Sequence, residues 1–388
     1  MNERFITVII QFRIHVSDIM TDGSDVYFTD MRACSNGSLL DKLKRLVYAA
    51  GIDRIDMKKK FVAVKIHFGE PGNTSYLRPN YAKVIVDIIR KKGGIPFLTD
   101  CNTLYVGRRK DAIEHLDVAY ENGFNPFATG CHVIIGDGLK GDDDIDIPMD
   151  GICLKSAKIG RAIADADIVI SMTHFKGHEM TGFGGTIKNL GMGCASRRGK
   201  MELHSANKPS VKVKKCTGCG YCVSRCAHSA ISMDDGKAHI DGTSCVGCGR
   251  CISMCRFDAI NVDMDNPNEI VCKRTAEYAC ASVIGKPNFH ISFVTDVSPK
   301  CDCYGYNDIP IVPDVGMFAS FDPVALDVAC ADAVNAQPVI EGSILRKRMK
   351  EGKDKFTCNH PTTDWRMVTE HAELMGLGIG RYVIREME

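Results

Sequence analysis

The sequence lacks a long apolar run. No stretch approaches the roughly 20 consecutive apolar residues that a transmembrane helix requires, and the best candidate, residues 5–14, is interrupted by Arg13. Asp18 follows that segment, where a signal peptide would carry small residues for cleavage. We therefore expect no membrane span and no signal peptide, and we expect the protein to be cytoplasmic.

The sequence also lacks an excess of charge of either sign. The chain has 49 Lys and Arg against 48 Asp and Glu, a formal net charge of +1. This composition indicates neither nucleic-acid binding nor an acidic tail. A Gly-x-Gly-x-x-Gly motif between a strand and a helix is also absent, which argues against a dinucleotide-dependent dehydrogenase. The sequence leaves open the binding of a flavin without that motif.

Cysteine, in contrast, is abundant, with 19 residues in a chain of 388. Disulfide frameworks are typical of short secreted chains with export signals. This chain is long, and eight of its cysteines fall in two tight groups with the spacing of metal ligands. We therefore predict reduced thiols in a reducing compartment.

Those eight cysteines form an internal repeat. Residues 216–226 and 245–255 share the spacing Cys-x2-Cys-x2-Cys-x3-Cys, with a glycine on each side of the second cysteine. Such glycines let the backbone close around a metal cluster. The repeat resembles the bacterial two-cluster ferredoxins, which implies two [4Fe–4S] clusters, each held by three cysteines of one copy and the fourth of the other. The implied ligand sets are Cys216, Cys219, Cys222 and Cys255 for one cluster, and Cys245, Cys248, Cys251 and Cys226 for the other.

The repeat departs from the ferredoxin pattern at one point. Ala227 and Arg256 replace the usual proline after the fourth cysteine, which leaves the ligand set unchanged. A pair of zinc sites is the alternative, but zinc gives no reason for a three-plus-one repeat. Clusters of this kind predict transfer of low-potential electrons, in an oxygen-poor cytoplasm, with an unidentified redox partner protein.

Outside the repeat, strand-like and helix-like segments alternate. Several strand-like runs are uniformly apolar, which is typical of parallel strands covered by helices on both faces. We therefore predict an α/β fold with a mostly parallel sheet and an inserted α+β ferredoxin-like module. The expected strands cover residues 26–30, 60–66, 95–99, 132–135, 168–172 and 290–294. The expected helices cover residues 38–52, 79–92, 111–122, 156–164, 323–334 and 365–375.

The domain organisation follows from where this alternation stops. It ends near Lys208 and resumes after residue 265. We predict one α/β domain in two parts, residues 24–207 and 266–388, with the cluster module inserted as residues 208–265. Insertion into a surface loop costs little entropy. Residues 1–23 precede the first expected strand, so we expect them to be an extension outside the fold.

A polar, glycine-rich segment, residues 173–193, directly follows the strand expected at residues 168–172. Ligands of open α/β sheets bind beyond the carboxyl ends of the strands. Backbone N–H groups in a glycine-rich loop, together with lysines, suit a small anion such as a carboxylate. His67 also follows an expected strand. The polar side chains of the segment are His174, Lys176, His178, Glu179, Thr186, Lys188 and Asn189.

Four segments carry a wider resemblance. They are Lys-Ile-His-Phe-Gly-Glu at residues 65–70, the segment of residues 174–193, Pro-Asp-Val-Gly at residues 313–316, and Ser-Phe-Asp-Pro-Val-Ala-Leu-Asp at residues 320–327. On these segments the chain resembles the DUF362 family of uncharacterised iron–sulfur proteins. The resemblance implies an α/β domain with an inserted two-cluster module, and it implies no particular reaction.

Several roles stay open for the polar residues. His174 and His178 are four residues apart, so on a helix they would share a face and could hold a metal. The surrounding glycines argue against a helix, which favours substrate contacts or structural hydrogen bonds. A histidine could also supply protons near neutral pH. The candidate catalytic residues are His174, His178 and Lys188, and the candidate substrate-binding residues are His67, Lys176 and Asn189.

Cys301 and Cys303 follow the strand expected at residues 290–294. They could bind one metal together, form a strained redox-active disulfide, or be incidental in a cysteine-rich chain. Cys194, Cys272 and Cys280 could complete a metal site with them.

Three functions fit the sequence, in this order. The first is a reductase that passes electrons from the two clusters to a small anionic substrate or a further centre in the α/β domain. The second is a carrier or maturation factor that delivers clusters or another metal. The third is an electron-transfer partner that docks another protein.

Overall fold

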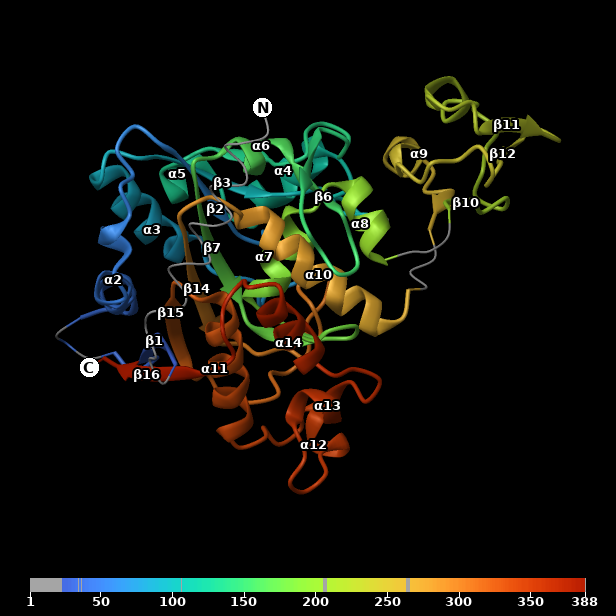
Figure 1. Ribbon diagram of the computed structural model, residues 1–388. Coiled ribbons are helices and arrows are strands. Elements are labelled where there is room, and N and C mark those ends of the chain that lie inside the picture. The colour runs from blue at the N-terminus through green and yellow to red at the C-terminus, as the bar shows by residue number, and fades with distance from the viewer. Residues whose placement is uncertain are drawn as a thin grey trace.

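The computed structural model describes residues 23–387, apart from residues 34, 36, 106, 205–207 and 263–265. Its centre is an eight-stranded sheet with the strand order β16-β1-β15-β14-β7-β2-β3-β4 (Figure 1). The strands are β1 (Ser24–Asp30), β2 (Phe61–Lys65), β3 (Ile95–Asp100), β4 (Val133–Ile135), β7 (Ile168–His174), β14 (Asn288–Val294), β15 (Gly316–Ser320) and β16 (Tyr382–Glu386). The expected extension at residues 1–23 lies, except for Gly23, outside the described residues.

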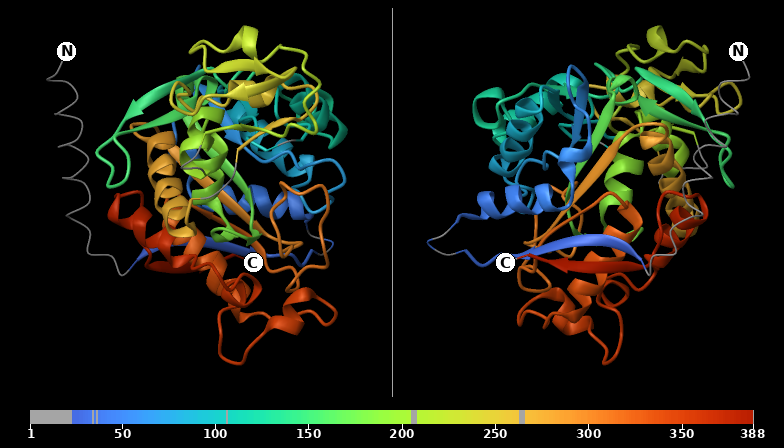
Figure 2. Two further views of the ribbon diagram at one scale, coloured as in Figure 1. Left: turned by 90° about the vertical axis from the view of Figure 1, so that its right-hand side faces the viewer. Right: turned by 60° about the vertical axis from the view of Figure 1, so that its left-hand side comes forward.

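The sheet is mixed but mostly parallel, as the sequence predicts. β15 is antiparallel to both of its neighbours, β1 and β14. The other neighbouring strands are parallel to each other. β1 and β16, from opposite ends of the chain, lie side by side at one edge (Figure 2). The parallel strands β14, β7, β2 and β3 therefore bring their carboxyl ends to one edge of the sheet.

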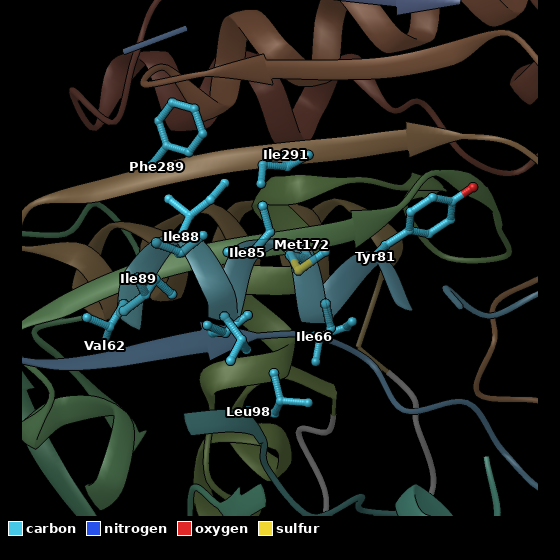
Figure 3. Close-up of a cluster of buried hydrophobic side chains, with 14 of the residues drawn as sticks. Val62, Ile66, Tyr81, Ile85, Ile88, Ile89, Leu98, Met172, Phe289 and Ile291 are labelled. Atoms are coloured by element: carbon cyan, nitrogen blue, oxygen red, sulfur yellow. The ribbon is translucent and has the colours of Figure 1, made fainter. Parts of the chain in front are cut away.

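Helices cover both faces of the sheet, which explains the uniformly apolar strands. All seven residues of β7 are buried, because both of its faces are covered. On one face, Ile85, Ile88 and Ile89 of α3 pack against Val62, Met172 and Ile291 of the sheet (Figure 3). The helices of this face are α2 (Leu39–Ala49) and α3 (Pro79–Lys91), with α4 (Ala112–Glu121) and α5 (Pro126–Thr129) beside them.

The opposite face carries the helices that position the polar residues. They are α7 (Thr186–Cys194), α10 (Asn268–Val283), α11 (Pro323–Ala336) and α14 (Arg366–Leu374). Ile187 and Leu190 of α7 are fully buried in the core on this side. The short helices α12 (Ile344–Arg348) and α13 (Lys355–Asn359) follow α11. Among the helices that the structure describes, none is long and apolar enough to cross a membrane.

The segment predicted as a helix at residues 156–164 is mostly a strand, so that prediction is wrong. β6 (Ser156–Gly160) pairs with β5 (Asp144–Pro148) in an antiparallel hairpin, and only α6 (Arg161–Asp165) is helical. Ala157 and Ile159 are buried while Ser156 and Lys158 are half-buried. This two-residue alternation is the period of a half-covered strand, and it outweighs the helix propensity of alanine and lysine.

The glycine-rich segment is ordered into a hairpin and a helix. β8 (Lys176–His178) pairs with β9 (Gly182–Gly184), and α7 begins two residues later at Thr186. Close packing supplies the reason for one glycine: a Cβ at Gly177 would lie 2.3 Å from the backbone oxygen of Pro299.

The N-terminus of α7 is held by a buried carboxylate. Asp327 of α11 is fully buried and accepts hydrogen bonds from the backbone N–H groups of Thr186, at 2.6 Å, and of Ile187, at 2.9 Å. These are two of the helix N–H groups that have no partner within the helix. Asp327 thereby fixes the helix that carries Lys188 and Asn189.

Replacing Asp327 by alanine is expected to lower the free energy of unfolding by about 2–4 kcal/mol, because two buried N–H groups lose their acceptor. Chemical denaturation of the full chain measures the change. Asp332→Ala, an exposed carboxylate on the same helix, is the matched control and should cost less than about 1 kcal/mol. Equal losses in the two variants would mean that Asp327 does not hold α7.

The cysteine-rich insert, residues 208–265, contains only small elements. β10 (Ser210–Val211) pairs with β13 (Ile260–Asn261), and β11 (Ile231–Asp234) pairs with β12 (Lys237–Ile240). α9 (Arg250–Met254) is its one α-helix within the described residues. The insert lies at one end of the molecule beside α8 (Arg197–His204) (Figure 1).

Two ion pairs and an apolar cluster join the insert to the α/β domain. Lys110 Nζ lies 2.6 Å from Asp258 Oδ1, and Arg250 Nε donates to Asp142 Oδ2 at 2.6 Å. Met201 of α8 packs with Ile252 and Ile260 of the insert in the apolar cluster. The insert is therefore anchored on α8 and the loop of residues 103–110.

Candidate functional site

A cavity of about 650 Å³ opens at the carboxyl edge of the sheet. Residues at or just beyond the ends of β2, β3 and β14 line it together with the β8–β9 hairpin, α7 and α8, as expected for an open α/β sheet. Its polar lining comprises Lys65, His67, Glu70, Asp100, Tyr105, Arg108, Arg109, Lys176, His178, Glu179, Lys188, Asn189, Lys200, His204, Cys301, Cys303 and Tyr304.

The structure brings most of the sequence-predicted site residues into this one cavity. His67, Lys176, His178, Lys188 and Asn189 all line it. They come from three separate elements: the end of β2, the β8–β9 hairpin and α7. Two further candidates, the sulfurs of Cys301 and Cys303, line the same cavity.

His174, the remaining candidate, is not part of the lining. Its Nδ1 faces the Asp302 carboxylate at 2.8 Å, and its Nε2 faces the backbone oxygen of Thr295 at 2.8 Å. Both ring nitrogens therefore face hydrogen-bond acceptors inside the protein. This arrangement favours a positioning role for His174 over the catalytic role that the sequence suggested.

Asp302 is the anchor of the Cys301–Cys303 turn. Its side chain is fully buried, and Lys176 Nζ lies 3.4 Å from Oδ2, the same oxygen that faces His174 Nδ1. Burial raises the pKa of Asp302, but the charges of His174 and Lys176 and the His174 hydrogen bond outweigh it and hold the pKa below its usual range. Asp302 thus stays ionised and holds the turn in place.

Cys301 has the surroundings of a stabilised thiolate. Lys188 Nζ donates to Cys301 Sγ at 3.7 Å, and the thiol is only 2% exposed. A hydrogen bond from the Cys303 thiol, followed by the Lys188 charge and a hydrogen bond from His178, holds the pKa of Cys301 well below its usual range despite burial. The same contact with Cys301, together with burial, raises the pKa of Cys303 well above its usual range. One proton is therefore held on Cys303 while Cys301 is ionised.

The hydrogen bonds of His178 set its tautomer. Backbone N–H groups of Met180 and Thr181 both donate to Nδ1 at 3.2 Å. Nδ1 therefore carries no proton, and the ring proton sits on Nε2. His178 is consequently a donor toward Cys301, which is a proton-holding role for the candidate catalytic residue.

A second polar network in the cavity was not predicted from the sequence. Arg109 Nε donates to Glu70 Oε2 at 2.7 Å, and Tyr105 Oη donates to the same oxygen at 3.0 Å. Lys65 Nζ lies 3.1 Å from Asp100 Oδ1. Asp100 is the last residue of β3, so its place at the end of a strand was the sequence feature that could have identified it as a site residue. Arg109 lies in a loop, and no sequence feature identified it.

His67 and Asn189 complete this wall of the cavity. Burial, followed by the nearby Arg109 charge, lowers the pKa of His67 to about 3, so the ring is neutral. Its Nδ1 accepts a hydrogen bond from the Gly69 N–H at 3.0 Å. Asn189 accepts from Lys65 Nζ at 2.7 Å and donates to the Thr173 hydroxyl at 3.0 Å. Both residues are held rigidly before any ligand arrives.

The eight repeat cysteines line two smaller cavities in the insert. The first is lined by Cys216, Cys219, Cys222 and Cys255. The second, of about 310 Å³, is lined by Cys226, Cys245, Cys248 and Cys251, and also by Cys222. Each cavity thus gathers three cysteines of one copy of the repeat and the fourth of the other, and Cys222 lines both.

Among the described residues, no third His, Cys, Asp or Glu joins Cys301 and Cys303 in a group whose ligand atoms all lie within 4.8 Å of one another. The suggested partners are Cys194 of α7 and Cys272 and Cys280 of α10, and none of the three lines the cavity.

One other group of possible ligand atoms lies away from the cavity. The ligand atoms of Cys153, Glu277 and His371 lie within 4.8 Å of one another. The Glu277 carboxylate already accepts the backbone N–H groups of Cys153, at 2.7 Å, and Leu154, at 2.8 Å, as well as His371 Nε2 at 2.9 Å. Through these bonds the buried Glu277 carboxylate holds the loop at residues 151–155 in place, which gives this carboxylate a structural role.

Helix α8 connects the insert with the large cavity. Lys200 and His204, four residues apart and so on one side of the helix, line the large cavity. Met201, on another side, packs against the insert. Leu104 lines the large cavity and belongs to the same apolar cluster, against which Cys222, Cys251 and Cys255 pack. The apolar cluster of Leu104 and Met201 therefore extends from the large cavity to cysteines of both copies of the repeat.

Comparisons with solved structures show only distant likeness. The lactate racemase apoprotein from Thermoanaerobacterium thermosaccharolyticum is 11% identical with a TM-score of 0.35, over 72% of this chain and 53% of that one. A protein from Thermotoga maritima solved by structural genomics is 14% identical with a TM-score of 0.40, over 79% and 60%. The chain thus spans less than two thirds of either protein.

Sequence comparison is more decisive. No curated protein gives a significant match. The family model "Domain of unknown function (DUF362)" matches residues 62–332, which is most of the chain and includes the insert. The segments at residues 65–70, 174–193, 313–316 and 320–327 all fall within this match. This protein therefore belongs to the DUF362 family.

Proposed function

We propose that this protein is an iron–sulfur oxidoreductase. In this proposal the insert is a ferredoxin-like module between two parts of one α/β domain, and each set of four cysteines holds a [4Fe–4S] cluster. The large cavity binds a small anionic substrate. When bound, such clusters supply single low-potential electrons.

The cysteine cavities fit clusters better than zinc. Backbone N–H groups donate to the sulfurs: Ala230 to Cys226 at 3.3 Å and Ala259 to Cys255 at 3.2 Å. Such N–H···S bonds tune iron–sulfur clusters. Tetrahedral zinc would hold its four sulfurs about 3.8 Å apart. Among the described cysteines of the repeat, no three sulfurs lie within 4.8 Å of one another, so the spacing favours the larger cluster.

One observation carries the proposal: α8 presents Met201 to the insert and Lys200 and His204 to the large cavity. Electron transfer requires short separations, and a single helix between the cysteines and the cavity provides one. The extra contacts of Lys110 and Arg250 fix the insert in this position. A module that only passed electrons to another protein would not require its clusters to lie close to a cavity of the α/β domain.

The charges of the cavity favour an anion. Lys65, Arg109 and Lys176 are paired with Asp100, Glu70 and Asp302, respectively. Within the described residues, Lys188 and Lys200 have no carboxylate within 4.0 Å. Lys188 Nζ donates to Cys301 Sγ and Lys200 Nζ donates to the Ala195 backbone oxygen, which leaves each ammonium group with further donors for a ligand. His178 holds a proton on Nε2 beside them, which suits protonation of a reduced substrate.

The carrier alternative loses its main support. It rested on Cys301 and Cys303 as a labile metal site, but Cys301 is buried and the pair lacks a third ligand in the described part of the chain. Docking of another protein remains as an outcome of the test below.

Reoxidation of the reduced protein tests the function. We expect the anaerobically purified chain, reduced with dithionite and freed of excess reductant, to be reoxidised at a saturable rate by a reducible small anion, with nitrite, sulfite and a 2-oxo acid as the probes. Visible absorbance of the clusters measures the rate. Lys188→Met should slow it by about 100-fold or more, since a charge that contacts the substrate is lost.

Lys83→Met is the matched control, because Lys83 is exposed and pairs only with Asp87 on the same helix. It should leave the rate unchanged. Reoxidation that no anion accelerates, or that Lys188→Met leaves intact, would contradict a substrate site in the cavity. The α/β domain would then serve to dock another redox protein.

A further inference from the structure

The turn at residues 301–303 aims two thiols in one direction. Asp302, between them, points into the protein, where it is fully buried against His174 and Lys176. Cys301 and Cys303 both line the large cavity instead. The Cys301 oxygen accepts the Tyr304 N–H at 3.1 Å, which closes the turn. The anchored middle residue thus fixes the two sulfurs side by side at the cavity wall.

We propose that Cys301 and Cys303 form a reversible dithiol–disulfide couple that takes part in the redox chemistry of this cavity. Residues two apart have Cα atoms no more than about 7.6 Å apart, and a turn shortens that distance toward the range of disulfides. Both residues line the same cavity, and each thiol shifts the pKa of the other, so the two are close neighbours. Loss of the remaining proton and rotation of the two side chains would bring the sulfurs into bonding distance.

The surroundings of the pair suit thiol–disulfide exchange. Such exchange requires a thiolate that attacks and a second thiol that resolves the mixed disulfide. Lys188 Nζ, 3.7 Å from Cys301 Sγ, and the neighbouring His178 stabilise the first as an anion. Cys303 is the half-exposed member of the pair and keeps its proton. One cysteine therefore has the character of a nucleophile and the other that of a protonated partner.

Other buried cysteines of the chain lack these features. Burial raises the pKa of Cys101 and of Cys330 well above the usual range. Cys101 donates to the backbone oxygen of Cys194 at 3.4 Å, and Cys330 lies in the apolar core under α11. These thiols are inert packing residues, so the arrangement at residues 301–303 is not a general property of a cysteine-rich chain.

Formation and reduction of the disulfide conserve electrons and protons. In the oxidising direction, the Cys301 thiolate and the Cys303 thiol lose two electrons and one proton, and a sulfur–sulfur bond forms. An oxidised disulfide such as glutathione disulfide accepts the two electrons and leaves as one thiol and one thiolate. In the reducing direction, a dithiol or a low-potential electron donor returns two electrons, and the proton returns to Cys303. A bond between residues two apart is strained, which favours a labile couple over a structural disulfide.

This couple deepens the proposed function, because it names a two-electron group beside the anion site. Its existence can be tested without a substrate and without reducing the clusters. A negative result for the couple and a negative result for substrate reduction are therefore distinguishable.

Quantitative alkylation tests the proposal. The anaerobically purified full chain is equilibrated in glutathione buffers of increasing oxidation, free thiols are trapped rapidly with an alkylating reagent, and peptides are analysed by mass spectrometry. Cleavage after Tyr304 yields a peptide with Cys301 and Cys303 but without Cys330. We expect this peptide to change from two alkyl groups to none, without a stable singly modified form. Cys330 and Cys131 should remain thiols throughout.

The Cys303→Ser variant is the second part of this test. Without the resolving thiol, Cys301 should retain one glutathione as a mixed disulfide, which the wild type does not accumulate. Two alkyl groups at every glutathione ratio, or a persistent glutathione adduct in the wild type, would overturn the couple. An unmodified Cys301 in Cys303→Ser would likewise overturn its assignment as the nucleophile.

Discussion

Cys226→Ser is expected to remove the cluster of the opposite repeat copy, the one that Cys245, Cys248 and Cys251 hold. Cys226 lines the same cavity as those three cysteines, although it is the fourth cysteine of the first copy. The variant should retain about four iron atoms per chain in place of about eight, because a three-cysteine site binds a cluster weakly. Iron and acid-labile sulfide analysis of anaerobically purified protein measures the loss.

The reciprocal variant makes this test specific. Cys255→Ser should remove the cluster held by Cys216, Cys219 and Cys222. Electron paramagnetic resonance of the reduced proteins should then show the spectrum of a different single cluster in each variant. Cys131→Ser, a buried cysteine outside the insert, should retain both. If Cys226→Ser and Cys216→Ser give the same spectrum, the three-plus-one assignment is wrong.

Cys301 is expected to react with iodoacetamide at neutral pH, and Lys188→Met should slow this reaction at pH 7 by about 2- to 10-fold. Loss of a charged hydrogen bond of about 1.5–3 kcal/mol corresponds to a rise of about one to two units in the pKa of the thiol. Only the thiolate reacts. Mass spectrometry of the peptide that ends at Tyr304 gives the rate at each pH.

The direction of the pH effect follows from the lowered pKa of Cys301. In the wild type, the rate should already be at its plateau near pH 7 and should fall only in more acidic buffer. In Lys188→Met, the rate should still rise between pH 7 and pH 9, toward the ordinary thiol range of about 8.5. A wild-type profile that rises through pH 8–9 would contradict a stabilised thiolate, whereas Lys83→Met should reproduce the wild type.

Much of the fold could be predicted from the sequence, because helices and strands reflect local periodicity. α3 begins at Pro79, as its fixed backbone angle favours, and β7 follows a wholly apolar run. The failure at residues 156–164 is instructive. Five residues are too few to separate a two-residue from a 3.6-residue period, so pairing with β5 decided the outcome.

The candidate site was predictable in part, for a topological reason. His67, His178 and Cys301 follow different strands, and parallel strands end at the same edge of the sheet. The buried partners were not predictable in this way. Asp302 meets His174 across 128 positions of sequence, and Arg109 reaches Glu70 from a loop. No local pattern indicates such contacts, because they depend on how distant segments pack.

The sequence by itself determined the cysteine repeat, the α/β class and the side chains that follow each strand, since these depend on spacing and local period. The tertiary structure decided which side chains meet. It gathered the fourth cysteine of each copy with the other three, turned α8 between insert and cavity, and placed Lys188 beside Cys301. The physical reason is that charge pairing and thiolate stabilisation act over a few ångströms, and only packing of the whole chain sets distances on that scale.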